Sequence, residues 1–289
     1  MKLGLLLATL FAVVLPSGFW RADETSIPGL PLAVQHTTND LDEAHKLVRM
    51  IVADTELVWS TVFASVGKTY RYPQLVLFSG TAFSACGRGQ GQAGPFYCPI
   101  DMRVYLDLSF FSELKSYFAS IAAKKEGSEG ALAFQDRPIP NQHAVLWAYA
   151  IAHEMGHHVQ TLLGIEQKVT ALEERLSQIE RDRLSTLFEL QADCLAGIWF
   201  SHIDKLKSRL EPGDLELALT GAAAVGADAL LKQAGATEMP DSFTHGTSAE
   251  RAYWLKRGFE SGEIKQCNTF DQRPHVPHLA PASPDRPKQ

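Results

Sequence analysis

The pattern HExxH at residues 153–157 lies inside a strongly apolar stretch, and it limits the folds open to this chain more than any other segment. Residues 141–163 carry apolar side chains on most helical turns, with Asn141 as a candidate N-cap and Gly164 just beyond the end. We therefore predict one buried helix here. Because burying two histidines and a glutamate without partners is costly, other elements must bring partners to them.

The two histidines of this pattern, His153 and His157, are four residues apart and share one face of a helix. Both imidazoles can then reach one metal ion, and Glu154 can reach a water molecule bound to that metal. Neutral nitrogen ligands suit Zn²⁺, and a carboxylate beside the water suits a general base. The alternative interpretation is a satisfied histidine pair in the core with a surface glutamate.

A catalytic zinc site needs a third protein ligand, which we expect from a second helix. Glu189 and Asp193 are spaced four apart within residues 187–206, an apolar segment for which we predict a helix. We predict that Glu189 binds the metal and that Asp193, one turn later, holds a ligand histidine through its other ring nitrogen. The alternative is an ordinary pair of exposed acidic residues.

These motifs and several others follow an order that resembles the bacterial neutral zinc metallopeptidases, a family of membrane-associated or exported proteins. The resemblance runs from about residue 75 to residue 270, in segments 84–87, 94–101, 104–108, 110–111, 152–160, 189–197, 242–248 and 267–270. It implies an α+β, mainly helical fold with a zincin-like core. That core consists of the HExxH helix, a downstream helix with the glutamate ligand, and a small strand region.

Two hypotheses for the function follow. In the first, the protein is a peptidase that holds Zn²⁺ with His153, His157 and Glu189, and Glu154 moves a proton during hydrolysis of a peptide or protein substrate. In the second, it is a catalytically silent, zinc-stabilised binding or chaperone-like module of the cell envelope. The presence of Glu154 favours the first, because a purely structural zinc needs no general base.

A run that begins at Thr244 is similar to the Thr-His-Pro-x-x-x-x-Arg run of another HExxH group, the CAAX-processing and heat-shock membrane proteases. Gly246 stands where that group has proline. The similarity implies that His245 stabilises the oxyanion of the reaction, with Arg251 behind it. The alternative is that Thr244 and His245 only cap the helix that begins near Ser248.

The N-terminus reads as an export signal. One lysine precedes an apolar run at residues 3–15, which has signal-peptide geometry and is short for a membrane span. No good cleavage site follows, so an uncleaved membrane anchor is the rival interpretation. Either way we expect an exported protein, periplasmic or extracellular, or anchored in the cytoplasmic membrane and facing outward.

Composition and length set the remaining limits. The net charge of −6, without a basic cluster, gives no electrostatic support for nucleic-acid binding. We divide the chain into a signal peptide or anchor at residues 1–22, a metallopeptidase domain at 35–270, and a proline-rich disordered tail at 271–289.

Four cysteines agree with export. Cys86 and Cys98 flank a glycine-rich loop, which we interpret as a turn between two short strands that is closed by a disulfide bond. Four cysteines allow three pairings, of which Cys86–Cys98 with Cys194–Cys267 is the most economical. Zinc binding by cysteine is the alternative interpretation.

The other predicted elements are mostly helices. They are helices at residues 41–66, 114–124, 166–185, 214–233 and 248–260, strands at 74–79 and 104–108, and a polar loop at 125–140. We expect one of the two strands to bind the substrate backbone along its edge. His158 points about 100° away from His157 around the helix, so we expect it to pack outside the metal site.

Overall fold

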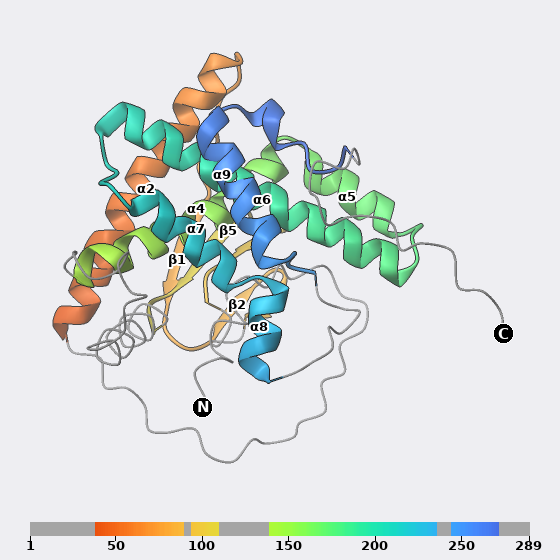
Figure 1. Cartoon of the computed structure of the whole chain (residues 1–289), viewed down its shortest axis with the longest axis horizontal. Coiled ribbons are helices and arrows are strands. Elements are labelled where there is room, and N and C mark those ends of the chain that lie inside the picture. The colour runs from red at the N-terminus through yellow and green to blue at the C-terminus, as the bar shows by residue number, and fades with distance from the viewer. Residues whose placement is uncertain (1–37, 90–93, 110–138, 236–243, 272–289) are drawn as a thin grey trace.

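The computed structural model describes residues 38–89, 94–109, 139–235 and 244–271 of the chain (Figure 1). The predicted N-terminal segment at 1–22, the helix at 114–124, most of the loop at 125–140 and all but the first residue of the tail lie outside these ranges. The described part is mainly helical with a small sheet, as predicted.

The helices and strands follow one another along the chain in a simple order. The helices are α2 (Thr38–Ser65), α4 (Ile139–Leu162), α5 (Ile165–Glu173), α6 (Gln178–Lys207), α7 (Asp214–Ala224), α8 (Ala227–Ala234) and α9 (Ser248–Ser261), with a 3-10 turn, η1 (Ile264–Cys267). The strands are β1 (Gln74–Phe78), β2 (Ala82–Ser84), β3 (Gly87–Gly89), β4 (Phe96–Cys98) and β5 (Arg103–Asp107).

The sheet has the strand order β1-β5-β4, with β5 parallel to β1 and antiparallel to β4. The strands predicted at 74–79 and 104–108 are confirmed as β1 and β5. Strand β5 is paired on both sides, so of the two strands expected to bind substrate only β1 has a free edge within the described sheet. The strand that lies at the edge and packs against α4 is β4, which is too short to give a periodic signal.

Helix α6 packs against both α4 and α9 and forms the centre of the helical part (Figure 1). The contact between α6 and α9 is backbone to backbone. A Cβ atom at Gly258 would lie 1.9 Å from the carbonyl oxygen of Cys194, and one at Gly197 would lie 2.0 Å from that of Leu255. The two glycines therefore allow the helices to touch, which fixes the position of the segment just before α9.

The helix that carries HExxH begins earlier than predicted. Helix α4 starts at Ile139, so Asn141 lies inside the helix and is not its N-cap. Pro140 is accepted there because the first N–H groups of a helix have no intrahelical partner to lose. The predicted end is confirmed, since Gly164 follows α4 with a left-handed φ of 71°.

Two predicted helix boundaries are wrong. The helix expected at 166–185 is divided, because Ser177 and Glu180 form a capping box that starts α6. That helix continues without a break to Lys207 and includes the predicted helix at 187–206. The helix expected at 214–233 is also divided, at Gly226, where a Cβ atom would lie 2.2 Å from the backbone nitrogen of Ser248.

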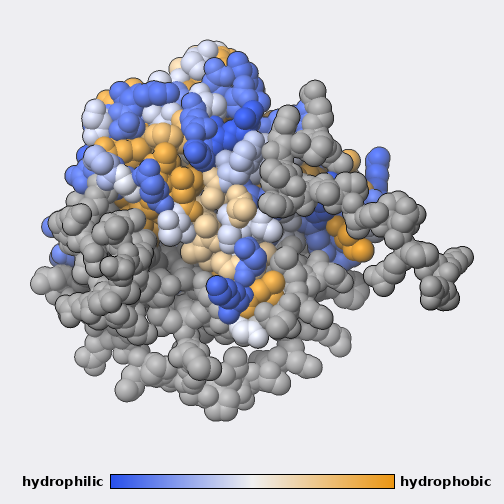
Figure 2. Space-filling model, in the orientation of Figure 1, coloured by the Kyte–Doolittle hydropathy of each residue, from blue (hydrophilic) through white to orange (hydrophobic). Residues whose placement is uncertain are grey.

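The surface gives one further feature. Figure 2 shows apolar patches between hydrophilic ones on the upper part of the face it presents. A cavity of about 230 Å³ lies among α2, α4 and α6, lined by residues that include Met50, Val145 and Trp199 but no residue of the HExxH pattern. Within the described ranges, no helix combines the length and apolar character needed to cross a bilayer.

Candidate metal centre

The two histidines of the HExxH pattern face each other on α4, as their spacing predicts. The Nε2 atoms of His153 and His157 are 3.2 Å apart, and both residues are almost completely buried. Their Nε2 atoms meet at one place inside the protein. This is the geometry that two ligands of one metal ion require.

Helix α6 brings Glu189 to the same place. Gly156 makes this possible, because a Cβ atom there would lie 2.9 Å from the carbonyl oxygen of Ala192. The Glu189 carboxylate oxygens lie 3.4 Å from His153 Nε2 and 3.5 Å from His157 Nε2. Among the described residues, these three side chains form a group whose candidate ligand atoms all lie within 4.8 Å of one another. This group of His153, His157 and Glu189 is called the metal cluster below.

The donor set fits a zinc ion. Two imidazole nitrogens and one carboxylate oxygen are the ligands of many catalytic zinc sites. Glu189 is buried, yet its Oε2 atom has no hydrogen-bond partner in the described part of the protein. A buried carboxylate oxygen without a donor is costly, and a metal cation at this position would supply the missing interaction.

The electrostatics of the three residues are coupled. Burial opposes a charge on Glu189, but His153, His157 and the nearby His245 hold the pKa of its carboxyl well below the usual range. Burial also disfavours a charged His153, but Asp193 and Glu189 outweigh it and raise the pKa of that imidazole to about 9. For His157 burial dominates and lowers the pKa to about 4.

Asp193 lies behind His153, on the side away from Glu189. Its Oδ1 atom is 2.9 Å from His153 Nδ1 and accepts a hydrogen bond of 2.7 Å from the hydroxyl of Tyr149. Arg251 donates to both carboxylate oxygens of Asp193, at 2.8 and 2.9 Å. The sequence interpretation placed Arg251 behind His245; in the structure this fully buried guanidinium pairs with Asp193 and neutralises it.

Glu154 lies beside the metal cluster and against strand β4. It is almost completely buried, and burial raises the pKa of its carboxyl to about 8, opposed by His153 and by a backbone hydrogen bond from Tyr97. Its Oε1 atom has no hydrogen-bond partner within the described ranges. The alternative of a surface glutamate is thus wrong.

His245 approaches the cluster from the segment before α9. Its Nδ1 atom is 3.6 Å from Glu189 Oε2, and its side chain is 21% exposed, more than any other residue of the site. It does not cap the following helix, because Thr247 and Glu250 form that capping box. Gly246 has a φ of 74°, which proline cannot adopt, and this accounts for glycine at that position.

His158 lies outside the cluster, as predicted. Its Nδ1 atom is 3.1 Å from the hydroxyl of Tyr97, and its Nε2 atom is 2.6 Å from the carbonyl oxygen of Arg71.

Gln160 is a residue that the sequence interpretation missed. It is fully buried, and its Oε1 atom is 2.8 Å from His157 Nδ1.

The four cysteines form the two disulfide bonds that we expected to be most economical. Cys86 is bonded to Cys98, and Cys194 is bonded to Cys267. No cysteine remains free, so the alternative of a zinc site with cysteine ligands is excluded for this oxidised form. Cys194 lies directly after Asp193 on α6, so the second bond connects the C-terminal η1 turn to the helix that carries Glu189.

Comparison with known proteins gives the same family as the motifs. Residues 10–131 and 136–270 match the family described as "Putative neutral zinc metallopeptidase". The chain is 45% identical over 266 residues to "Uncharacterized protein YpfJ" of Escherichia coli (strain K12), covering 90% of this chain and 85% of that protein. It is 33% identical over 252 residues to an uncharacterized protein of Mycobacterium tuberculosis (strain H37Rv), covering 84% and 76%.

A search of solved structures found no match. The family match covers nearly the whole chain, and the metal cluster lies within it. The chain therefore belongs to the family of neutral zinc metallopeptidases.

Proposed function

We propose that the protein is a zinc-dependent peptidase with a zincin-like core, in which His153, His157 and Glu189 hold the metal and Glu154 is the general base. One observation carries this proposal above the others. Three buried ligand side chains converge from two helices, and a fourth buried side chain, Glu154, lies beside them with an oxygen that nothing else in the described part engages.

The chemistry assigned to each residue follows from its surroundings. When bound, zinc supplies a Lewis acid for water and for the peptide carbonyl. Glu154 accepts a proton from the attacking water and delivers it to the leaving nitrogen. Burial raises the pKa of the Glu154 carboxyl above its usual range, which strengthens it as a base toward a proton from water. His245, partly exposed beside Glu189, donates a hydrogen bond to the developing oxyanion.

The substrate of this site would be an extended peptide or protein segment. Strand β4 packs against α4, and the backbone N–H of Tyr97 in β4 hydrogen-bonds to Glu154. In the described sheet β4 pairs with β5 alone. An extended chain added along β4 would place a peptide bond next to Glu154, so we assign to β4 the role that the sequence interpretation gave to one of the strands at 74–79 and 104–108.

The proposal includes the cellular compartment in which the protein functions. Two disulfide bonds persist in an oxidising compartment, which favours an exported protein. Mass spectrometry of native protein without reductant should recover Cys86 bridged to Cys98 and Cys194 bridged to Cys267. Free thiols at these positions in freshly isolated protein would argue against export.

The competing hypothesis, a silent zinc-stabilised module, leaves Glu154 without a purpose. A buried carboxyl without a partner for one oxygen destabilises a fold, and a structural zinc would not require it. The function can be tested by comparing peptide termini in cells that carry wild-type protein or Glu154→Gln. If the protein is a peptidase, cells with the wild-type protein contain peptide termini that are missing from cells with Glu154→Gln. Identical termini at equal protein levels would contradict the proposal.

A further inference from the structure

Gln160 connects one of the ligand histidines to the rest of the protein. It lies one turn after His157 on α4 and is fully buried. Its Oε1 atom is 2.8 Å from His157 Nδ1, while its Nε2 atom donates to the carbonyl oxygen of Phe188 at 2.8 Å and to Oε1 of Gln191 at 3.0 Å. All the hydrogen-bonding groups of this amide therefore point at α4 or α6.

The orientation of the Gln160 amide is determined by its partners. The carbonyl oxygen of Phe188 can only accept a hydrogen bond, so the NH₂ group of Gln160 must face it. The amide oxygen then faces His157, and Nδ1 of that ring must carry the proton. The Nε2 atom of His157 is left with its lone pair directed at Glu189 and His153, where a metal ligand needs it.

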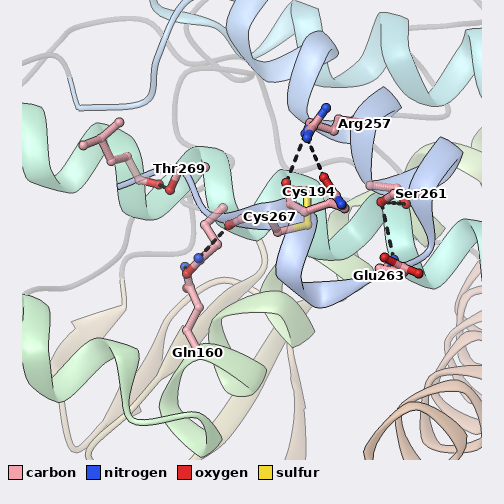
Figure 3. Close-up of a disulfide and its surroundings, with 11 residues drawn as sticks. Gln160, Cys194, Arg257, Ser261, Glu263, Cys267 and Thr269 are labelled. Carbon is pink, nitrogen blue, oxygen red and sulfur yellow. Dashed lines mark hydrogen bonds between the residues drawn. A yellow bond between two sulfur atoms is a disulfide. The ribbon is translucent and has the colours of Figure 1, made fainter. Parts of the chain in front are cut away.

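Gln191 extends this connection to the C-terminal part of the chain. Its Nε2 atom donates to the carbonyl oxygen of Cys267 at 2.8 Å, and this contact fixes its Oε1 atom toward Gln160. The disulfide bond to Cys194 holds Cys267 against α6. Figure 3 shows the Gln160 side chain rising from its helix toward Cys267, beside the disulfide.

We infer that Gln160 and Gln191 are positioning residues that hold His157 in the Nδ1–H form, anchored by the carbonyl oxygens of Phe188 and Cys267. This inference rests on the proposed function, because it assigns a purpose to the tautomer that metal binding requires. The two ligand histidines are then supported differently. A carboxylate, Asp193, supports His153, and a neutral amide supports His157.

A neutral acceptor at His157 has a physical reason. Glu154, Glu189 and Asp193 already place three carboxyl groups in one buried region, with Arg251 as the buried cation that pairs with Asp193. Another carboxylate would add a charge that the site would have to desolvate. The amide orients the imidazole without that charge, and its second function as a donor ties α4 to α6.

The test uses Gln160→Met and Gln191→Met, with Gln178→Met as the control on an exposed position of α6. Zinc affinity is measured by competition with a chelator. We expect Gln160→Met to weaken binding roughly tenfold to a hundredfold, Gln191→Met to weaken it less, and Gln178→Met to leave it unchanged. Wild-type affinity in both Gln160→Met and Gln191→Met would overturn the inference.

A spectroscopic measurement separates positioning from general stability. In imidazole ¹⁵N spectra of the zinc-loaded protein, the Nδ1 proton of His157 should be sharp and slow to exchange, assigned by its absence in His157→Gln. Gln160→Met should lose this signal, and Gln178→Met should keep it. A sharp Nδ1 proton in Gln160→Met would overturn the inference.

These results are independent of catalysis. A protein that shows the expected changes in zinc affinity and spectra but cleaves no peptide would refute the proposed function and leave the inference standing. A protein that cleaves peptides while Gln160→Met behaves as wild type would refute the inference alone.

Discussion

At the scale of single residues, each member of the metal cluster has a distinct neighbour that sets its chemical state. His153 is held by Asp193, His157 by Gln160, and Glu189 has the partly exposed His245 beside it. The charge and tautomer of these three residues thus depend on groups outside the cluster as well as on one another. Two consequences can be measured on single variants.

The first consequence concerns the proton on His153. Its pKa is raised to about 9 in the metal-free fold, so the imidazole is protonated at pH 7 and must lose a proton before Nε2 can bind zinc. Zinc affinity should therefore rise with pH, about tenfold per unit below pH 9. Titration calorimetry of Glu154→Gln in buffers of different ionisation enthalpy should find one proton released per zinc at pH 7. Release of none would contradict the account of His153.

The second consequence concerns His245. A donor that acts only on the oxyanion affects turnover more than substrate binding, so His245→Ala should keep zinc and nearly keep KM. Its kcat should fall on the order of a hundredfold to a thousandfold. Lys256→Ala, an exposed position on α9, serves as the control. Loss of zinc in His245→Ala would make the residue a ligand or a ligand support instead.

At the scale of elements, the site depends on how closely α4 and α6 approach. Gly156 lies between the two histidines of the HExxH pattern, and its Cα faces the backbone of Ala192. Gly156→Ala would push α6 away and move Glu189 out of reach, so zinc affinity and thermal stability should both fall. Gly221→Ala is the matched control, because the nearest atoms to a Cβ there belong to the side chains of Leu146 and Tyr149 and not to a helix backbone. Unchanged zinc affinity in Gly156→Ala would contradict the claim that the site depends on the close approach of α4 and α6.

The sequence predicts what is local to one helix, and it predicts contacts between two helices only where a motif marks both partners, as for His153 and Asp193. The spacing of His153, Glu154 and His157 predicts their common face because one helix determines it. The contacts of Gln160 with Gln191 and of Arg251 with Asp193 join positions 31 and 58 residues apart. No periodic pattern marks such a pair. A buried glutamine inside an apolar helix is the one signal that could have suggested Gln160.

The positions where the helices begin and end show the same difference between local and distant causes. The capping box at Ser177 and Glu180 is visible in the sequence, and attention to it would have divided the predicted helix at 166–185. The break at Gly226 has a distant cause, since the backbone of Ser248 occupies the space that a side chain would need. Strand β4 was missed because three residues carry too little pattern.

At the scale of the whole molecule, two disulfide bonds close loops of very different length. Cys194 and Cys267 are 73 residues apart, and Cys86 and Cys98 are 12 apart. In the chain-entropy model these bonds contribute about 4 and about 3 kcal/mol, respectively. Replacing Cys194 and Cys267 by alanine should therefore lower the free energy of unfolding more than replacing the other pair, as measured by urea denaturation. The opposite order would contradict this ranking.

The same long loop makes the metal site sensitive to the C-terminal end of the described chain. The Cys194–Cys267 bond fixes the carbonyl oxygen that Gln191 binds, and Thr269 donates to the carbonyl oxygen of Leu187 at 2.6 Å on the same helix. The segment after α9 is thus held along α6 on both sides of Glu189. The support of the site extends from α4 to the last described turn.

The central claim is that zinc held by His153, His157 and Glu189 enables hydrolysis with Glu154 as the base. The direct measurement is peptide cleavage by purified protein after removal and return of zinc, with metal content determined for each sample. Wild type should bind one zinc per chain and cleave only when zinc is present. Glu154→Gln should bind one zinc and cleave nothing, and Glu189→Ala should bind none. Cleavage by zinc-loaded Glu154→Gln at the wild-type rate, or a full equivalent of zinc in Glu189→Ala, would contradict the account.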